Sequence, residues 1–195
     1  MASRPCRRQG VAGVPPGTDF VSLGSAHPFP QELAVRNHPH VLFICTGNYY
    51  RSRFAEAVFN HHARRQAIPW RAFSRGLSLF LPQGALSPHV IVGLTRRGIA
   101  LTNTTMDPTP LTEANLRRAA IRIALFESEH RPMVARLFPE WETKTTYWRI
   151  PDLDEVTPDE GLAMIEAEVV RLIEELQGRP EAVCPDTATA PRSTR

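Results

Sequence analysis

The chain has 195 residues, enough for one domain with a substantial core and hardly enough for two. Its net charge of +3 is mild, and its basic residues form no stripe interleaved with aromatic residues, which argues against nucleic-acid binding. No apolar run is long enough to cross a membrane, no secretory signal follows Met1, and three widely spaced cysteines fit a reducing compartment such as the cytoplasm.

Residues 1–37 are rich in proline, glycine and small side chains, as in the Pro15-Pro16-Gly17 run. They show no sustained periodicity, so we expect a flexible extension whose role the sequence does not indicate. Residues 179–195 are polar and follow Gly178 and Pro180, which predicts a disordered tail. Residues 38–178 between these ends are the predicted catalytic domain.

The first element of this domain is a short strand followed by a loop and a helix. Val41 to Ile44 are four consecutive apolar residues, which is typical of a strand buried on both faces. The helix is expected to run from Arg51 to about Gln66, with Phe54, Ala55, Val58 and Phe59 on its apolar face.

The loop between them, residues 45–50, has the composition of an oxyanion-binding site. The first N–H groups of a helix lack intrahelical partners and carry partial positive charge, so a loop wrapped over that end binds a tetrahedral oxyanion. Gly47 allows a close backbone approach, and Asn48 tolerates a positive φ. Arg51 adds a planar guanidinium that matches two phosphate oxygens at once.

Cys45 lies at the mouth of this positive field, which favours the nucleophilic thiolate. Ser52 is placed to donate a hydrogen bond to its sulfur. Cys-x5-Arg alone is a weak pattern, because a lone cysteine is usually a small buried apolar residue. Cys-x5-Arg-Ser directly between a buried strand and an amphipathic helix is a much stronger indication of a phosphate site.

Strands and helices alternate through the rest of the domain. We expect strands at 70–74, 121–126 and 145–150, and helices at 88–97, 127–138 and 158–176, with Ser87 and Thr157 as amino-terminal caps. A further short helix is expected to start after Thr112, again a cap residue. This order predicts an α/β fold, a three-layer doubly wound arrangement around a four-stranded parallel sheet. Ligands of such sheets bind at the carboxyl ends of the strands, where Cys45 and Asp152 would meet.

The stretch from Val41 to Ser52, followed by Phe54-Ala55-Glu56-Ala57, resembles the signature of the low-molecular-weight protein tyrosine phosphatases, and the resemblance runs from about His40 to Leu176. It implies the flavodoxin-like, phosphotyrosine phosphatase I-like fold and a hydrolase that uses no metal or cofactor. In such a hydrolase Cys45 attacks phosphorus, Arg51 binds the phosphate and Asp152 is the general acid, with Asp154 as the rival. The residues expected at the substrate are Thr46, Gly47, Asn48, Tyr49, Tyr50, Ser52 and Ser74, the last of which would brace Asn48.

The expected partner is a phosphotyrosine-containing protein or a small aryl phosphate, with inorganic phosphate as product. Tyr49 and Tyr50 could flank a phenyl ring, although Tyr50 could instead pack inward. Many relatives carry a second cysteine at the Tyr50 position, able to form a disulfide with the nucleophile. The related arsenate reductases share the loop but need further cysteines, and Cys6 and Cys184 lie in the expected flexible ends.

A third hypothesis is a catalytically weak module that binds phosphate or phosphopeptides. It draws on two departures from the family pattern, Arg75 in the Ser74-Arg75-Gly76 turn and Phe126 where an acidic residue is expected. A metal site has little support. His61 and His62 are adjacent and cannot share a helix face, and two further histidines at 38 and 40 have no cysteine or carboxylate at ligand spacing.

Overall fold

The computed structural model describes residues 38–79 and 86–178, so the expected extension 1–37 and tail 179–195 lie outside the described residues. The strands are β1 (His40–Cys45), β2 (Arg71–Gly76), β3 (Ile121–Ala124) and β4 (Thr146–Tyr147). The helices are α1 (Arg51–Arg65), α2 (Pro88–Arg96), α3 (Glu113–Arg118), α4 (Glu127–Leu137) and α5 (Pro158–Gln177), with short 3₁₀ turns η1 (Leu101–Asn103) and η2 (Pro139–Trp141).

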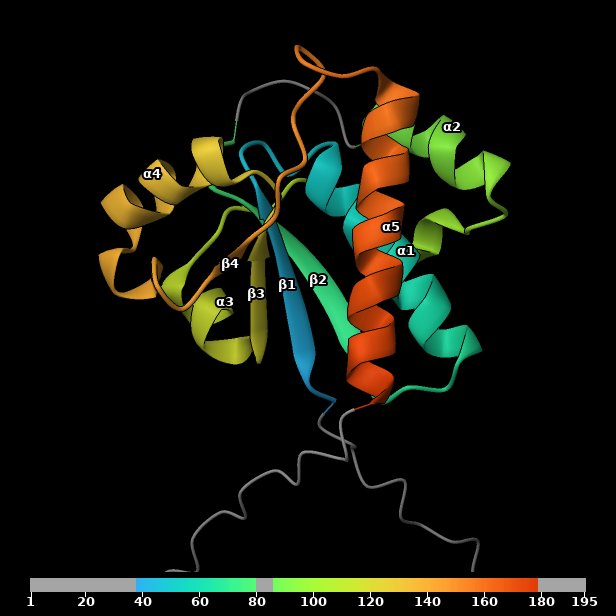
Figure 1. Cartoon of the computed structure of the whole chain (residues 1–195), viewed down its shortest axis with the longest axis horizontal. Coiled ribbons are helices and arrows are strands. Elements are labelled where there is room, and N and C mark those ends of the chain that lie inside the picture. The colour runs from blue at the N-terminus through green and yellow to red at the C-terminus, as the bar shows by residue number, and fades with distance from the viewer. Residues whose placement is uncertain (1–37, 80–85, 179–195) are drawn as a thin grey trace, which may run out of the picture. The chain divides into compact units, whose positions relative to one another are not determined.

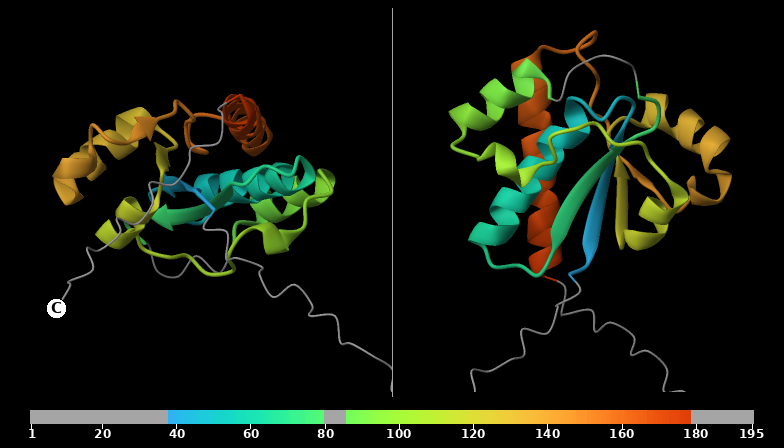
Figure 2. Two further views of the ribbon diagram at one scale, coloured as in Figure 1. Left: turned by 90° about the horizontal axis from the view of Figure 1, so that it is seen from below. Right: turned by 180° about the vertical axis from the view of Figure 1, so that it is seen from behind.

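The four strands form one parallel sheet in the order β2-β1-β3-β4 (Figure 1). β1 therefore lies between β2 and β3, and it is buried on both faces because a hydrophobic cluster packs against each side of the sheet. Its last residue, Cys45, pairs with Gly76 of β2, and the preceding Ile44 pairs with Ala124 of β3. The predicted doubly wound α/β fold is confirmed, and Figure 2 shows the helices on both sides of the sheet.

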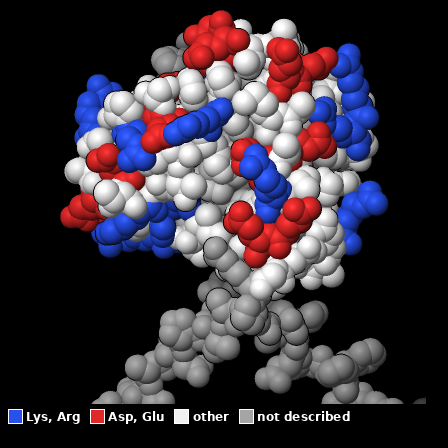
Figure 3. Space-filling view, in the orientation of Figure 1, with Lys and Arg blue, Asp and Glu red and all other residues white. Residues whose placement is uncertain are grey.

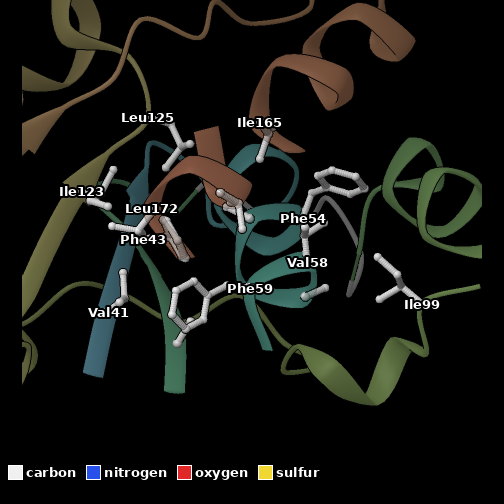
Figure 4. Close-up of a cluster of buried hydrophobic side chains, with 14 of the residues drawn as sticks. Val41, Phe43, Phe54, Val58, Phe59, Ile99, Ile123, Leu125, Ile165 and Leu172 are labelled. Carbon is white, nitrogen blue, oxygen red and sulfur yellow. The ribbon is translucent and has the colours of Figure 1, made fainter. Parts of the chain in front are cut away.

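The larger core fills the space between one face of the sheet and helices α1 and α5. Val41 and Phe43 point from β1 into this layer, where they meet Phe59 of α1 and Leu172 of α5 (Figure 4). Burying each such side chain stabilises the fold by about 1.5–3 kcal/mol. This layer therefore holds β1, and the start of the loop that follows it, in place. The position of Cys45 therefore depends on it.

The opposite face of the sheet carries a second, smaller cluster. Leu42 and Ile44 point to this side, because side chains alternate along a strand, and Leu116 of α3 packs there with Phe138 and Trp141. Arg122, which interrupts the apolar run of β3, donates hydrogen bonds to the carbonyls of Leu116 and Ala119. Its guanidinium thereby supplies donors to carbonyl groups at the carboxyl end of α3.

The predicted helix caps are present at two of three positions. Thr112 and Thr157 each form a capping box, accepting from the N–H of Asn115 and Glu160 respectively. Ser87 occupies the residue before α2, with Pro88 at the first helical position, but its side chain makes no cap hydrogen bond. Gly98 ends that region with a φ of 65°, where a side chain is strained.

The expected strand at 145–150 is much shorter than predicted, because only Thr146 and Tyr147 form regular strand pairs with β3. β3 ends at Ala124. Beyond Tyr147, the N–H groups of Trp148 and Ile150 still donate to the carbonyls of Ala124 and Leu125, at 2.9 and 3.0 Å. The chain then departs after an isolated bridge between Arg149 and Phe126. The tyrosine and β-branched residues predicted a strand correctly but could not indicate its length.

Basic and acidic side chains are interspersed on the face shown in Figure 3. Within residues 38–79 and 86–178, none of the helices has the length and apolar character that crossing a membrane requires.

Candidate active site

The loop that joins β1 to α1 forms the floor of the site. Cys45 is the buried last residue of β1, and α1 begins six residues later at Arg51. Asn48 has a φ of 49°, the positive value that its side chain was expected to allow. In the described part of the chain, no backbone hydrogen bond starts from the N–H groups of residues 46–50. These groups are therefore available to an oxyanion.

The sulfur of Cys45 lies 3.0 Å from the hydroxyl oxygen of Ser52, inside the first turn of α1. Asn48 donates through its side-chain nitrogen to Ser52 Oγ at 3.1 Å and to Ser74 Oγ at 2.9 Å. The contact expected between Ser74 and Asn48 is thus present. Because the Ser52 oxygen accepts from Asn48, its own proton is directed toward the sulfur of Cys45.

A buried carboxylate stands behind this chain of hydrogen bonds. Glu56 accepts from the hydroxyls of Ser74 and Thr104, each at 2.7 Å, and Arg53 donates to Thr104 at 2.9 Å. Burial raises the pKa of Glu56, although the two hydroxyls oppose this. Sequence reasoning missed Glu56, whose only signal was its place in the Phe54-Ala-Glu-Ala run.

Arg51 is buried, and two carboxylates hold its guanidinium. Its Nη2 donates to Glu129 Oε2 at 2.8 Å and to Asp152 Oδ2 at 2.7 Å. Its Nη1 lies 3.5 Å from the carbonyl oxygen of Ile150, a long contact. The sheet topology therefore brings together three residues that are 101 positions apart at the extremes, at the carboxyl ends of the strands as expected.

Glu129 is the second residue of the site that sequence reasoning missed. It lies in the first turn of α4, and its carboxylate also accepts a hydrogen bond from the hydroxyl of Thr46 in the loop. It follows three positions after Phe126, where an acidic residue was expected, and its carboxylate contacts Arg51. Burial acts to raise the pKa of Glu129, but the hydrogen bond from Thr46 and the charge and hydrogen bond of Arg51 together lower it.

His130 lies beside Glu129 and is fully buried. Its Nδ1 accepts from the backbone N–H of Phe126 at 2.9 Å. Burial, with the charge of Arg51, lowers the pKa of His130 to about 4. The ring is therefore neutral at neutral pH, and its Nε2, 3.4 Å from Glu129, has no hydrogen-bond partner among the described residues.

These side chains line a pocket of about 480 Å³. Its lining comprises Cys45, Thr46, Gly47, Tyr49, Tyr50, Arg51, Ser87, Pro88, His89, Glu129, Asp152 and Leu153. All the loop residues expected at the substrate line it, except the buried Asn48, which acts from behind with Ser52 and Ser74. We refer to this space as the catalytic pocket.

The two loop tyrosines differ in orientation. Tyr49 is half-buried at the pocket wall, whereas Tyr50 is only 7% exposed and donates its hydroxyl hydrogen bond to the carbonyl of Pro158 at 3.1 Å. Burial raises the pKa of Tyr50 to about 12. Tyr50 therefore packs inward, which is the second of the two orientations considered from the sequence, although it still lines the pocket.

The remaining candidates lie outside the catalytic pocket. Asp154 is exposed and lines an adjoining hollow, and Arg75 donates to the Ser74 carbonyl and stacks over Phe73, 5.0 Å from the ring centre. No group of three or more histidine, cysteine or acidic side chains within the described ranges could hold a metal ion.

Residues 40–180 match the sequence profile described as low molecular weight phosphotyrosine protein phosphatase, a match over well more than half of the chain. The chain belongs to this family. Hydrolysis of phosphate esters and related bonds is the family's chemistry, so the chain is an enzyme of the phosphatase class.

Individual relatives agree with the family assignment. A protein-arginine-phosphatase of Bacillus subtilis is 32% identical over 104 residues, which are 53% of this chain and 66% of that protein, just under two thirds. The structure of a low molecular weight protein tyrosine phosphatase from T. tengcongensis matches with a TM-score of 0.61 at 25% identity, covering 70% of this chain and 99% of that one. A thioredoxin-dependent arsenate reductase of Corynebacterium glutamicum matches with a TM-score of 0.54 at 25% identity, covering 71% and 62%.

Proposed function

We propose that this member of the family is a phosphoprotein phosphatase that hydrolyses phosphotyrosine through a phosphocysteine intermediate. The observation that carries the proposal is the position of the Cys45 sulfur, which lines the catalytic pocket with Arg51 and lies 3.0 Å from the Ser52 hydroxyl. A nucleophile, an oxyanion-binding loop and a proton donor to the leaving group are the parts that two-step phosphoryl transfer requires.

In the first step the thiolate of Cys45 attacks phosphorus, and the phosphorus–oxygen bond to the tyrosine breaks. The loop N–H groups and Arg51 stabilise the three equatorial oxygens in the transition state. Asp152, protonated, gives its proton to the departing oxygen. The Ser52 hydroxyl stabilises the sulfur when it leaves again.

In the second step a water molecule attacks the phosphocysteine and releases inorganic phosphate and the free thiolate. Asp152, now a carboxylate, accepts the proton of that water, which restores it as an acid. Its side chain is 45% exposed and lines the pocket, so it reaches both the leaving group and the incoming water.

A second candidate substrate is phosphoarginine, which the printed name of the Bacillus subtilis relative suggests. The observation that favours it is the pair of carboxylates, Glu129 and Asp152, that line the pocket beside Arg51. Their oxygens can accept hydrogen bonds from the cationic guanidinium group of phosphoarginine, whereas the phenyl ring of phosphotyrosine has no donor for them. The half-buried Tyr49 favours the aromatic substrate instead.

Arsenate reduction is a weaker alternative. Cys45 is the free cysteine of the described residues, and the two others needed for an electron relay, Cys6 and Cys184, lie outside them. Reduction of arsenate in the presence of thioredoxin would establish that activity.

The proposal is tested with p-nitrophenyl phosphate, a phosphotyrosine peptide and a matched phosphoarginine peptide. Wild type should turn over the aryl phosphate and the phosphotyrosine peptide, and Cys45→Ser should lose that turnover yet still bind vanadate, because the loop and Arg51 remain. Undiminished turnover by Cys45→Ser would exclude the phosphocysteine. A higher kcat/KM for the phosphoarginine peptide would select the second candidate, and phosphate binding without wild-type turnover would indicate a binding module.

A further inference from the structure

A protein substrate must have a path by which its polypeptide leaves the catalytic pocket, and this inference rests on the proposed function. One hollow that adjoins the pocket lies between α2 and the start of α5 and has a volume of about 490 Å³. It is lined by Pro88, His89, Val92, Arg96, Thr157, Pro158 and Asp159. We call it the α2/α5 cleft.

The α2/α5 cleft adjoins the catalytic pocket, and Pro88 and His89 line both. Tyr50, which lines the catalytic pocket, contacts two residues of the cleft. Its hydroxyl is bonded to Pro158, and its ring meets His89 edge-on with centroids 6.4 Å apart. A peptide that leaves the pocket past Pro88 and His89 would reach the cleft.

The floor of the cleft is apolar and its far rim is charged. Val92 is 48% exposed, and it lines the cleft with Pro88 and Pro158. Arg96 and Asp159 form the rim and pair at 3.3 Å, but both are so exposed that the pair contributes little to stability. An apolar floor within a polar rim is the arrangement that binds one apolar side chain of an extended peptide.

The two walls of the cleft are held in place before any ligand binds. Gly93 of α2 packs so closely on α5 that a side-chain carbon there would lie 2.4 Å from Leu162 Cδ1. Arg97 of α2 also pairs with Glu166 of α5 at 2.7 Å. A preformed cleft loses little conformational freedom on binding, so its contacts contribute more fully to affinity.

We propose that the α2/α5 cleft is a docking subsite for the substrate polypeptide, which places an apolar side chain on Val92 while its phosphorylated residue occupies the catalytic pocket. A second hollow, lined by Ser128, Glu129, Asp152, Asp154 and Glu155 among others, leaves the pocket on the other side. Its carboxylates would attract basic residues of a substrate rather than an apolar side chain, and the peptide series below distinguishes the two hollows. The subsite of the proposal is the apolar cleft.

The test compares two adjacent positions of α2 in the full chain. Val92→Asn removes the apolar floor, whereas Ile91→Asn makes the same change at a neighbour that is 38% exposed and does not line the cleft. For phosphopeptides with leucine at successive positions beside the phosphorylated residue, one peptide should bind best to wild type. Val92→Asn should raise its KM about tenfold, with p-nitrophenyl phosphate kinetics unchanged and Ile91→Asn without effect on either.

Equal KM values for Val92→Asn and Ile91→Asn on every peptide would overturn the docking subsite. A preference for lysine or arginine beside the phosphorylated residue that Val92→Asn leaves intact would also overturn it and assign docking to the acidic hollow. Binding of the same peptides to Cys45→Ser, followed by fluorescence anisotropy, gives the comparison without turnover. Failure of wild type to hydrolyse p-nitrophenyl phosphate counts against the proposed function alone.

Discussion

In the mechanism that we propose, Asp152 serves both steps of the reaction. Its Oδ2 accepts from Arg51 at 2.7 Å, and its Oδ1 accepts from the N–H of Leu153 at 2.9 Å. These contacts aim the carboxylate into the catalytic pocket from the chain that follows β4. Asp154, two residues later, is exposed and does not line that pocket.

Asp152→Asn should slow substrates with poor leaving groups much more than those with good ones. Tyrosine phosphate needs its leaving oxygen protonated, whereas p-nitrophenolate leaves with little assistance, and general acid catalysis contributes about 10²–10⁴-fold. The measurement is kcat for a series of aryl phosphates of rising leaving-group pKa, with Asp154→Asn as the matched control. A steeper dependence in Asp154→Asn than in Asp152→Asn would reverse the assignment.

Most residues of the candidate site could be predicted where they share one strand, loop and helix. The spacing of Cys45, Arg51 and Ser52 determines their relative positions once β1 and α1 form. Glu129 and Glu56 could not be predicted in this way. Glu129 reaches Arg51 only through the turn of α4, and Glu56 acts through Ser74 from behind the loop.

The pairing of α2 with α5 is the element-level feature on which the cleft depends. Gly93 lies where α2 crosses α5, and Phe54 of α1 is the next neighbour, 3.4 Å from the position of an added carbon. Leu162 is 1% exposed and therefore has little room to move. A glycine in the middle of a helix costs up to about 1 kcal/mol relative to alanine, so the close contact is what explains it here.

Gly93→Ala should destabilise the domain by about 1–3 kcal/mol, because crowding against Leu162 outweighs the gain in helix propensity. Urea denaturation measures this difference. Gly178→Ala is the control, since a carbon added there meets nothing closer than 3.8 Å. A Gly93→Ala protein as stable as wild type would mean that Leu162 repacks without cost.

The elements themselves were largely predictable, because their caps and apolar periods are local signals. α3 and α5 begin where Thr112 and Thr157 predicted. β4 was predicted too long, since the length of an edge strand depends on how far its neighbour extends, and β3 ends at Ala124. Tyr50 packs inward because Pro158 offers a carbonyl acceptor, a contact across 108 positions that no local pattern reveals.

At the scale of the whole molecule, the buried His130 links the stability of the fold to pH. Its pKa of about 4 in the folded state lies below the value of about 6.5 expected in the unfolded chain. Between pH 6.5 and about 4 the unfolded state therefore binds a proton that the folded state does not. The free energy of unfolding must fall as the pH is lowered through this window.

His130→Asn should reduce that fall, because asparagine does not titrate yet can accept the hydrogen bond from the Phe126 N–H. The variant should be less stable than wild type at pH 7.5, since the smaller side chain leaves a cavity. The measurement is the free energy of unfolding of both proteins at pH 7.5 and pH 5.5, from urea titrations. Parallel losses in the two proteins would show that other groups govern the acid response.

The fold class followed from the alternation of strands and helices, and the strand order β2-β1-β3-β4 is the doubly wound one expected. That order explains why Cys45, Glu129 and Asp152 meet at one end of the sheet. The roles of the extension 1–37 and the tail 179–195 could not be predicted, because neither segment carries a periodic pattern or a motif.

β1 starts at His40 and α5 ends at Gln177, and both points lie at the end of the sheet opposite to Cys45 (Figure 1). The side-chain nitrogen of Gln177 donates a hydrogen bond to the side-chain oxygen of Gln66 at 2.8 Å, which links the end of α5 to the end of α1. A support surface or a fused reporter protein joined at residue 38 or residue 178 would therefore be attached at the end of the domain opposite to the catalytic pocket. Immobilised through either point, the enzyme would present its pocket to the passing solution.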